Sequence, residues 1–164
     1  MTDMCPACGH VGGPADGPVH AYMTSSPGCW ARYGEVLARD YSDAAYRAHH
    51  RALTDAWSVQ HSISDDRRAR QSFYLHLAAL VLKVERDAPD AAIVAFLRRA
   101  AASGHPFPHV QAPPPCAEAR PDAVYDAPGA AAHAAAVDAY ARAVLAQWAP
   151  HHGAVRALIE EVGP

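Results

Sequence analysis

Residues 5–30 have the sequence CPACGHVGGPADGPVHAYMTSSPGCW, which concentrates potential metal ligands among residues that form turns. The density of glycine and proline excludes a regular helix or strand over most of this stretch. A segment without regular backbone hydrogen bonding needs another source of order, and cysteine and histidine side chains that share a metal ion provide one. We therefore predict that residues 1–30 form an irregular metal knuckle.

Four residues of this stretch are the candidate ligands. Cys5 and Cys8 form a CxxC pair, a spacing that lets two thiolates bind one cation. We predict that His20 and Cys29, which lie in the same irregular segment, complete a Cys3His zinc site. The alternative is that Cys5 and Cys8 are redox-active or incidental, with Cys29 a small residue of the core.

Length and charge narrow the class of protein. A chain of 164 residues suffices for one domain with a sizeable core, and a net charge of -3 predicts no attraction to nucleic acid or anionic lipid. No apolar run approaches the roughly 20 residues that span a bilayer, and the first five residues have neither the basic nor the apolar region typical of a signal peptide. We expect a cytoplasmic protein with free thiols, for which a small molecule is the partner class left open. The sequence does not indicate an oligomeric state.

The rest of the chain has helical periodicity. The spacing of apolar residues predicts helices over residues 29–40, 43–61, 69–86 and 90–99, and a last helix over 130–162 that Pro150 kinks or restarts. Seven prolines within residues 104–129 predict a surface excursion instead of a packed element. The fold class is therefore all-α, a helical bundle in one domain. Its parts are the knuckle (1–30), helices (31–103), the excursion (104–129) and the kinked terminal helix (130–164).

Eleven histidines are the outlier in the composition, and several of them fall on helix faces expected to be buried. His50 and His61 share one helix, His76 lies on the next, and His151 and His152 lie at the kink. Antiparallel helices can bring such residues to one level of a bundle. These five residues form a second candidate metal site, with His50, His76 and His151 as candidate catalytic residues.

The alternative for each histidine alone is a core residue hydrogen-bonded to a neighbour. Several buried histidines together require a metal, a polar network or a water-filled pocket. Asp55, Gln60 and Gln71 are polar residues that could orient the imidazoles.

The remaining motifs do not indicate a catalytic or phosphate-binding site. Arg67, Arg68 and Arg70 form a short basic cluster that is explained by a solvated loop more simply than by a phosphate site. The chain has no phosphate-binding glycine loop, no nucleophile elbow and no HExxH motif.

A resemblance to a known family rests on five segments: CPACG (5–9), DGPVHAYMTSSPGCWARYGEVLARDYSD (16–43), HRALTDAWSVQH (50–61), QSFYLHL (71–77) and WAPHHGAVRAL (148–158). Together they resemble the uncharacterised bacterial family filed as domain of unknown function 5946. The resemblance implies one domain and no particular activity. The positions it marks are Cys5, Cys8, His20, Cys29, His50, Asp55, His61, Gln71, His76, His151 and His152.

A second resemblance concerns the ending HHGAVRALIEEVG (151–163), which looks like the last helix of DinB and YfiT-type bundles. These four-helix proteins commonly hold a divalent metal through three histidines, and they include thiol transferases and suspected hydrolases. Their last-helix pair is usually spaced by three residues, whereas His151 and His152 are adjacent. The resemblance implies a divalent metal at the second candidate site.

Two functions are compatible with these patterns. The first is a metal-dependent enzyme in which an ion near the bundle histidines activates water or a thiol. The alternative is a non-catalytic module that binds a small ligand or a protein and whose zinc is purely structural. A closed four-ligand site favours structure, and three protein ligands with solvent in a pocket favour catalysis.

Overall fold

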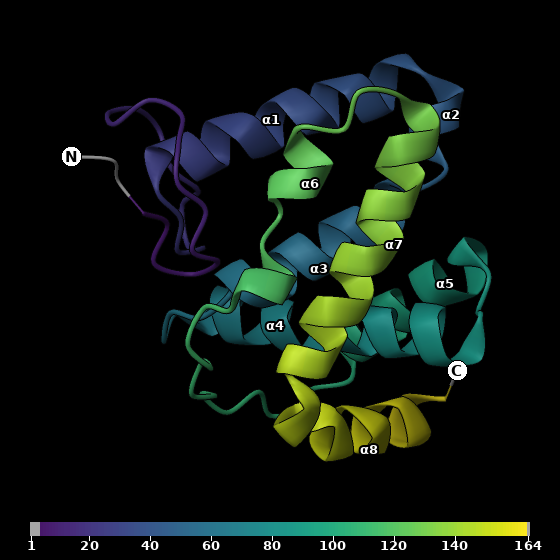
Figure 1. Ribbon diagram of the computed structural model, residues 1–164. Coiled ribbons are helices and arrows are strands. Elements are labelled where there is room, and N and C mark those ends of the chain that lie inside the picture. The colour runs from purple at the N-terminus through teal and green to yellow at the C-terminus, as the bar shows by residue number, and fades with distance from the viewer. Residues whose placement is uncertain (1–3, 164) are drawn as a thin grey trace.

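Figure 1 shows the computed structural model, which describes residues 4–163. This part of the chain is helical and contains no strand, apart from one isolated antiparallel bridge between Met4 and Val11. The all-α prediction is confirmed. None of the described helices combines the length and hydropathy needed to cross a bilayer. The α-helices are α1 (Pro27–Ser42), α2 (Ala44–Arg47), α3 (His50–His61), α4 (Arg67–Leu80), α5 (Asp90–Ala102), α6 (Asp122–Tyr125), α7 (Ala130–Gln147) and α8 (His152–Val162). A π-helical segment, η1 (Val81–Glu85), continues α4, and η2 (Ala117–Ala119) and η3 (Ala149–His151) are short 3-10 helices.

Helix α1 starts where its capping residues predict. Ser26 is the N-cap, its hydroxyl accepting a hydrogen bond from the backbone N–H of Cys29 at 3.1 Å, and Pro27 occupies the first turn. Because Cys29 lies in that first turn, the cap also fixes the position of its thiol. The N-terminal segment lies beside this end of α1 (Figure 1).

The helix expected over residues 43–61 is two helices. Asp43 caps α2, its carboxylate accepting from the backbone N–H of Ala45 at 2.8 Å, and the chain turns before α3 begins. The turn lets Tyr46 and His49 both contact the ring of His133 on α7. Tertiary packing overrides the local helical preference at this point.

The core lies where α3 packs between α4 and α7, with α8 and α5 packed on α4. Helix α7 runs from α2 at one end of the molecule to α8 at the other (Figure 1). The predicted interruption near Pro150 is confirmed, since α7 ends at Gln147, η3 follows and α8 begins at His152. The largest fully buried apolar side chains are Leu53, Trp57, Phe73, Leu77, Leu80, Ile93, Phe96, Trp148, Leu158 and Ile159.

Residues 104–129, expected to be a surface excursion, are packed in their second half. Val124 is fully buried and Tyr125 is 5% exposed, both in α6. His10 Nδ1 lies 2.5 Å from the Asp122 carboxylate, which ties α6 to the N-terminal segment. The expectation is wrong for this second half, because proline prevents long helices but does not prevent a short turn from burying its apolar residues.

Candidate metal centre

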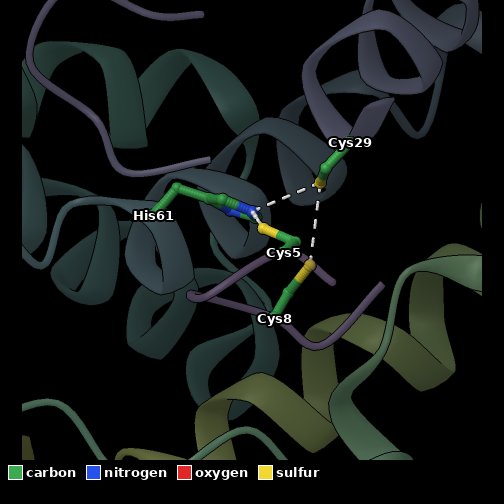
Figure 2. Close-up of side chains that lie close together, drawn as sticks. All are labelled: Cys5, Cys8, Cys29 and His61. Atoms are coloured by element: carbon green, nitrogen blue, oxygen red, sulfur yellow. Dashed lines mark hydrogen bonds between the residues drawn. The ribbon is translucent and has the colours of Figure 1, made fainter. Parts of the chain in front are cut away.

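Four buried side chains from three separate segments meet in one cluster (Figure 2). Cys5 and Cys8 come from the N-terminal turn, Cys29 from the start of α1 and His61 from the last residue of α3. Their three Sγ atoms and one imidazole nitrogen all lie within 4.8 Å of one another, and each residue is 0% exposed. Within residues 4–163, no other group of three or more such side chains is close enough to hold an ion.

The turn that carries Cys5 and Cys8 is held by its own backbone. The N–H of Cys5 donates to the carbonyl of His10 at 2.8 Å, and the N–H of Gly9 donates to the carbonyl of Cys5 at 2.9 Å. Gly9 has φ +77°, a left-handed conformation that glycine adopts at least cost. The turn thereby brings both sulfurs to the same side.

His61 has its ring orientation and tautomer fixed by Trp57. His61 Nδ1 lies 2.7 Å from the backbone carbonyl of Trp57, which can only accept, so Nδ1 carries the proton. The indole of Trp57 stacks on the imidazole with ring centroids 3.7 Å apart. The lone pair of Nε2 is left facing Cys5 and Cys29, whose Sγ atoms lie at 3.6 and 3.5 Å. A carbonyl on the far nitrogen is the usual support of a metal-binding histidine.

The spacing of the four atoms fits tetrahedral coordination. In a regular tetrahedron with zinc–sulfur distances of about 2.3 Å, neighbouring sulfurs lie about 3.8 Å apart. Cys8 Sγ and Cys29 Sγ are 3.6 Å apart, and the distances from His61 to Cys5 and Cys29 are similar. The donor atoms present therefore fit a four-coordinate ion.

The thiols share protons when no cation is bound to them. Hydrogen bonds with Cys29 and Cys8 lower the pKa of Cys5 below the usual range of a thiol and outweigh its desolvation. The hydrogen bond with Cys5, together with burial, raises the pKa of Cys29 to about 12, and contacts with Cys29 and Cys5 raise that of Cys8. Three adjacent buried thiolates repel one another, and a bound cation removes that repulsion.

Tyr125 forms a second layer around the sulfurs. Its hydroxyl accepts from the indole N–H of Trp57 at 3.0 Å and lies 3.4 Å from Cys29 Sγ. Burial raises the pKa of Tyr125 well above its usual value, so the phenol keeps its proton and can donate it to Cys29. Residues 104–129 thus contribute to the centre.

We expect Tyr125→Phe to weaken metal binding by about 10-fold or more, because the donor to Cys29 is lost and the Trp57 indole N–H is left unpaired. Competition with a chromogenic chelator measures the affinity. Tyr41→Phe is the matched control, since the hydroxyl of Tyr41 contacts His50 at an exposed position away from the cluster. Equal affinities of the two variants would contradict a role for the phenol.

A comparison of the sequence with protein-family models matches most of the chain. A family model described as "Family of unknown function (DUF5946)" matches residues 3–149, which include all four residues of the cluster. The chain belongs to this family. No curated protein matches the chain, and no solved structure matches it. The DUF5946 match ends between α7 and α8, so His151 and His152 lie beyond it.

His20, the predicted fourth ligand, is not in the cluster of this DUF5946 protein. His61 is the fourth residue of the cluster instead. His20 Nδ1 accepts from the backbone N–H groups of Tyr22 and Met23 at 3.4 and 3.3 Å, and its ring contacts Trp30 edge-on. Burial lowers the pKa of His20. The residue therefore supports the irregular segment that precedes α1.

The histidines of the second candidate site do not come together in the described part of the DUF5946 chain. His50 Nδ1 lies 3.2 Å from the buried carboxylate of Asp40, and His76 Nδ1 lies 2.7 Å from that of Asp55. Each histidine has its own acidic partner on a different pair of helices. These pairs fit the alternative of histidines in a polar network. The prediction that His50, His61, His76, His151 and His152 share a metal site is wrong for the described residues.

The two histidines at the kink are also separate from the others. The ring of His151 packs edge-on against Phe73, and His152 Nε2 lies 2.8 Å from the carbonyl of Leu145. The three-histidine centre that the DinB and YfiT resemblance implies is therefore not assembled among residues 4–163 of this DUF5946 protein.

Proposed function

We propose that Cys5, Cys8, Cys29 and His61 bind one zinc ion, and that this zinc is structural in a non-catalytic module that binds a small ligand. The observation that supports it is the enclosure of a complete four-ligand set, in which every residue is 0% exposed. A catalytic zinc keeps one coordination position open to water or substrate. Four protein ligands shielded from solvent leave no such position.

Zinc is the metal that the donor atoms favour. Three thiolates and one imidazole in a tetrahedral arrangement are typical of structural zinc, whereas magnesium and calcium prefer oxygen ligands. Zinc also carries no redox chemistry that would oxidise the neighbouring thiols.

The role of the ion in the proposal is to join segments that are far apart in the sequence. Residues 4–26 contain no helix, and the cluster ties their first turn to the start of α1 and the end of α3. Structural zinc contributes about 10–16 kcal/mol of binding free energy in zinc-finger peptides. An energy of this size is sufficient to order a segment rich in glycine and proline.

The enzyme hypothesis needs an open ion near the helix histidines. His50 and His76 instead donate to separate buried carboxylates, and His151 packs against aromatic rings. The binding-module alternative requires only the closed zinc site, and the proposal adopts it for that reason.

A pair of histidine variants tests the ligand assignment. We expect the purified protein to contain about one equivalent of zinc, His61→Ala to lose at least about 100-fold in zinc affinity, and His20→Ala to retain its zinc. Elemental analysis and chelator competition measure both. The proposal fails if His20→Ala loses the metal while His61→Ala keeps it, or if the wild-type protein binds no zinc.

A further inference from the structure

Asp55 and His76 form a pair outside the metal cluster that the proposed zinc site does not explain. Asp55 lies on α3 and is 0% exposed, and its Oδ1 is 2.7 Å from Nδ1 of His76 on α4. Arg51 also binds both oxygens of this carboxylate, with Nε 2.8 Å from Oδ2. Because Arg51 already balances the charge of Asp55, His76 is not needed to neutralise it.

The pair fixes the tautomer of His76. A carboxylate bound to arginine only accepts hydrogen bonds, so Nδ1 of His76 carries a proton. The remaining polar atom of the ring is Nε2, and no described residue forms a hydrogen bond with it. The side chain is 22% exposed, so Nε2 is the atom able to meet a ligand.

His76 lines a pocket of about 230 Å³ between α4 and the irregular N-terminal segment at Tyr22. The same pocket contains Arg68, an exposed residue whose guanidinium forms no hydrogen bond or ion pair with any described residue. Leu75 and the ring of Tyr22 supply apolar and aromatic surface. The full lining is Tyr22, Arg68, Gln71, Ser72, Leu75 and His76.

We propose that this pocket binds a small organic anion that carries a hydroxyl group at the end opposite its charge. Arg68 binds the carboxylate or phosphate, and Nε2 of His76 accepts a hydrogen bond from the hydroxyl. Arg68 and His76 are eight residues apart on one helix, which corresponds to about 12 Å along its axis. That separation requires an elongated ligand whose middle packs on Leu75 and Tyr22.

The pocket wall depends on the zinc cluster, and this part of the inference rests on the proposed function. The backbone N–H of Thr24 donates to the carbonyl of His61 at 2.8 Å, and the hydroxyl of Ser64 donates to the carbonyl of Tyr22 at 2.9 Å. The end of α3 that supplies the fourth ligand therefore also positions Tyr22 over α4. The structural zinc thereby helps to hold Tyr22, which forms the wall of the pocket opposite α4.

The test uses full-length, metal-loaded protein labelled with 15N-histidine and titrated with 4-hydroxybenzoate. The imidazole resonances of His76 are assigned by their loss in His76→Gln. We expect a saturable shift of these resonances in the wild-type protein. Isothermal titration calorimetry compares the variants, and we expect binding at least about 10-fold weaker in Arg68→Gln and His76→Gln. Benzoate, which lacks the hydroxyl, is expected to bind several-fold more weakly than 4-hydroxybenzoate.

Arg67→Gln is the matched control, because Arg67 is adjacent in sequence but lines a different pocket with Arg70 and His105. We expect it to leave binding unchanged. The inference is overturned if neither probe shifts the His76 resonances, or if Arg67→Gln weakens binding as much as Arg68→Gln. Zinc content measured on the same samples separates the two proposals. Full metal without a ligand response rejects the pocket alone, and a ligand response without metal rejects the structural zinc.

Discussion

Protein in which Cys5 and Cys8 are both replaced by serine is expected to lose its metal and to release residues 4–26 from the helices. The double substitution removes two of the four ligands, and serine hydroxyls do not replace thiolates at a zinc site. Since this segment has no helix and only one isolated β-bridge, its backbone has little regular hydrogen bonding to order it once the metal is lost. We expect a loss of at least about 3 kcal/mol in the free energy of unfolding, a large part of what holds a small domain together. Elemental analysis, urea unfolding and hydrogen exchange of residues 4–26 measure these effects.

Cys116→Ser is the matched control for the thiol chemistry. Cys116 is a free, half-buried cysteine outside the cluster, so its removal is expected to leave the metal content and the stability unchanged. Metal retained by the double variant at wild-type affinity would reject the site, because Cys29 and His61 alone cannot hold zinc tightly. Metal lost by Cys116→Ser would show that a different set of thiols is involved.

The sequence predicts the three cysteines of the metal cluster, which lie close together along the chain, but not the histidine. The CxxC spacing places Cys5 and Cys8 together through a turn of a few residues, and the Ser26 cap fixes Cys29 nearby. His61 depends instead on the end of α3 reaching the start of α1, a contact between helices that no short spacing encodes. Its only signal was a histidine at the end of a helix, on a face expected to be buried.

For the histidines on the helices, the sequence predicts burial but not the partner of each side chain. Periodicity correctly predicts that His61 lies on a buried face, but it gives no information about which partner each imidazole meets. His50 and His76 meet separate buried carboxylates, Asp40 and Asp55, which pair with them across helices. Of these partners, Asp55 was recognisable as a polar residue that could orient an imidazole. The pairing itself depends on how the helices pack.

Helix ends with strong local chemistry were predicted more closely than helix interiors. Pro150, expected to kink or restart the last helix, lies in the short η3 segment that separates α7 from α8. The turn between α2 and α3 has no such residue and was missed, because it depends on contacts with His133. The prolines of residues 104–129 predicted a surface excursion, but short helical segments in its second half bury their apolar residues.

Gly28→Ala is expected to be the most disruptive single substitution outside the ligands. A Cβ at Gly28 would lie 1.8 Å from the carbonyl oxygen of Gly12 and 3.2 Å from Cα of Gly13. These are backbone atoms, so the clash is relieved only if the loop moves away from the first turn of α1. Because Cys29 is the next residue, such a movement also separates its thiol from the knuckle. We expect a loss of about 3 kcal/mol or more in the free energy of unfolding, together with weaker zinc binding.

Gly34→Ala separates this steric effect from the effect of alanine in a helix. Gly34 lies in the same helix, and a Cβ there meets nothing within 4 Å. Alanine at this position is expected to stabilise the protein by about 0.5–1 kcal/mol, since glycine inside a helix costs about that much. Urea unfolding with zinc present gives both values. If the two variants had equal stability, the loop would not be held against α1, and the cluster would lack the contact that keeps Cys29 facing Cys5 and Cys8.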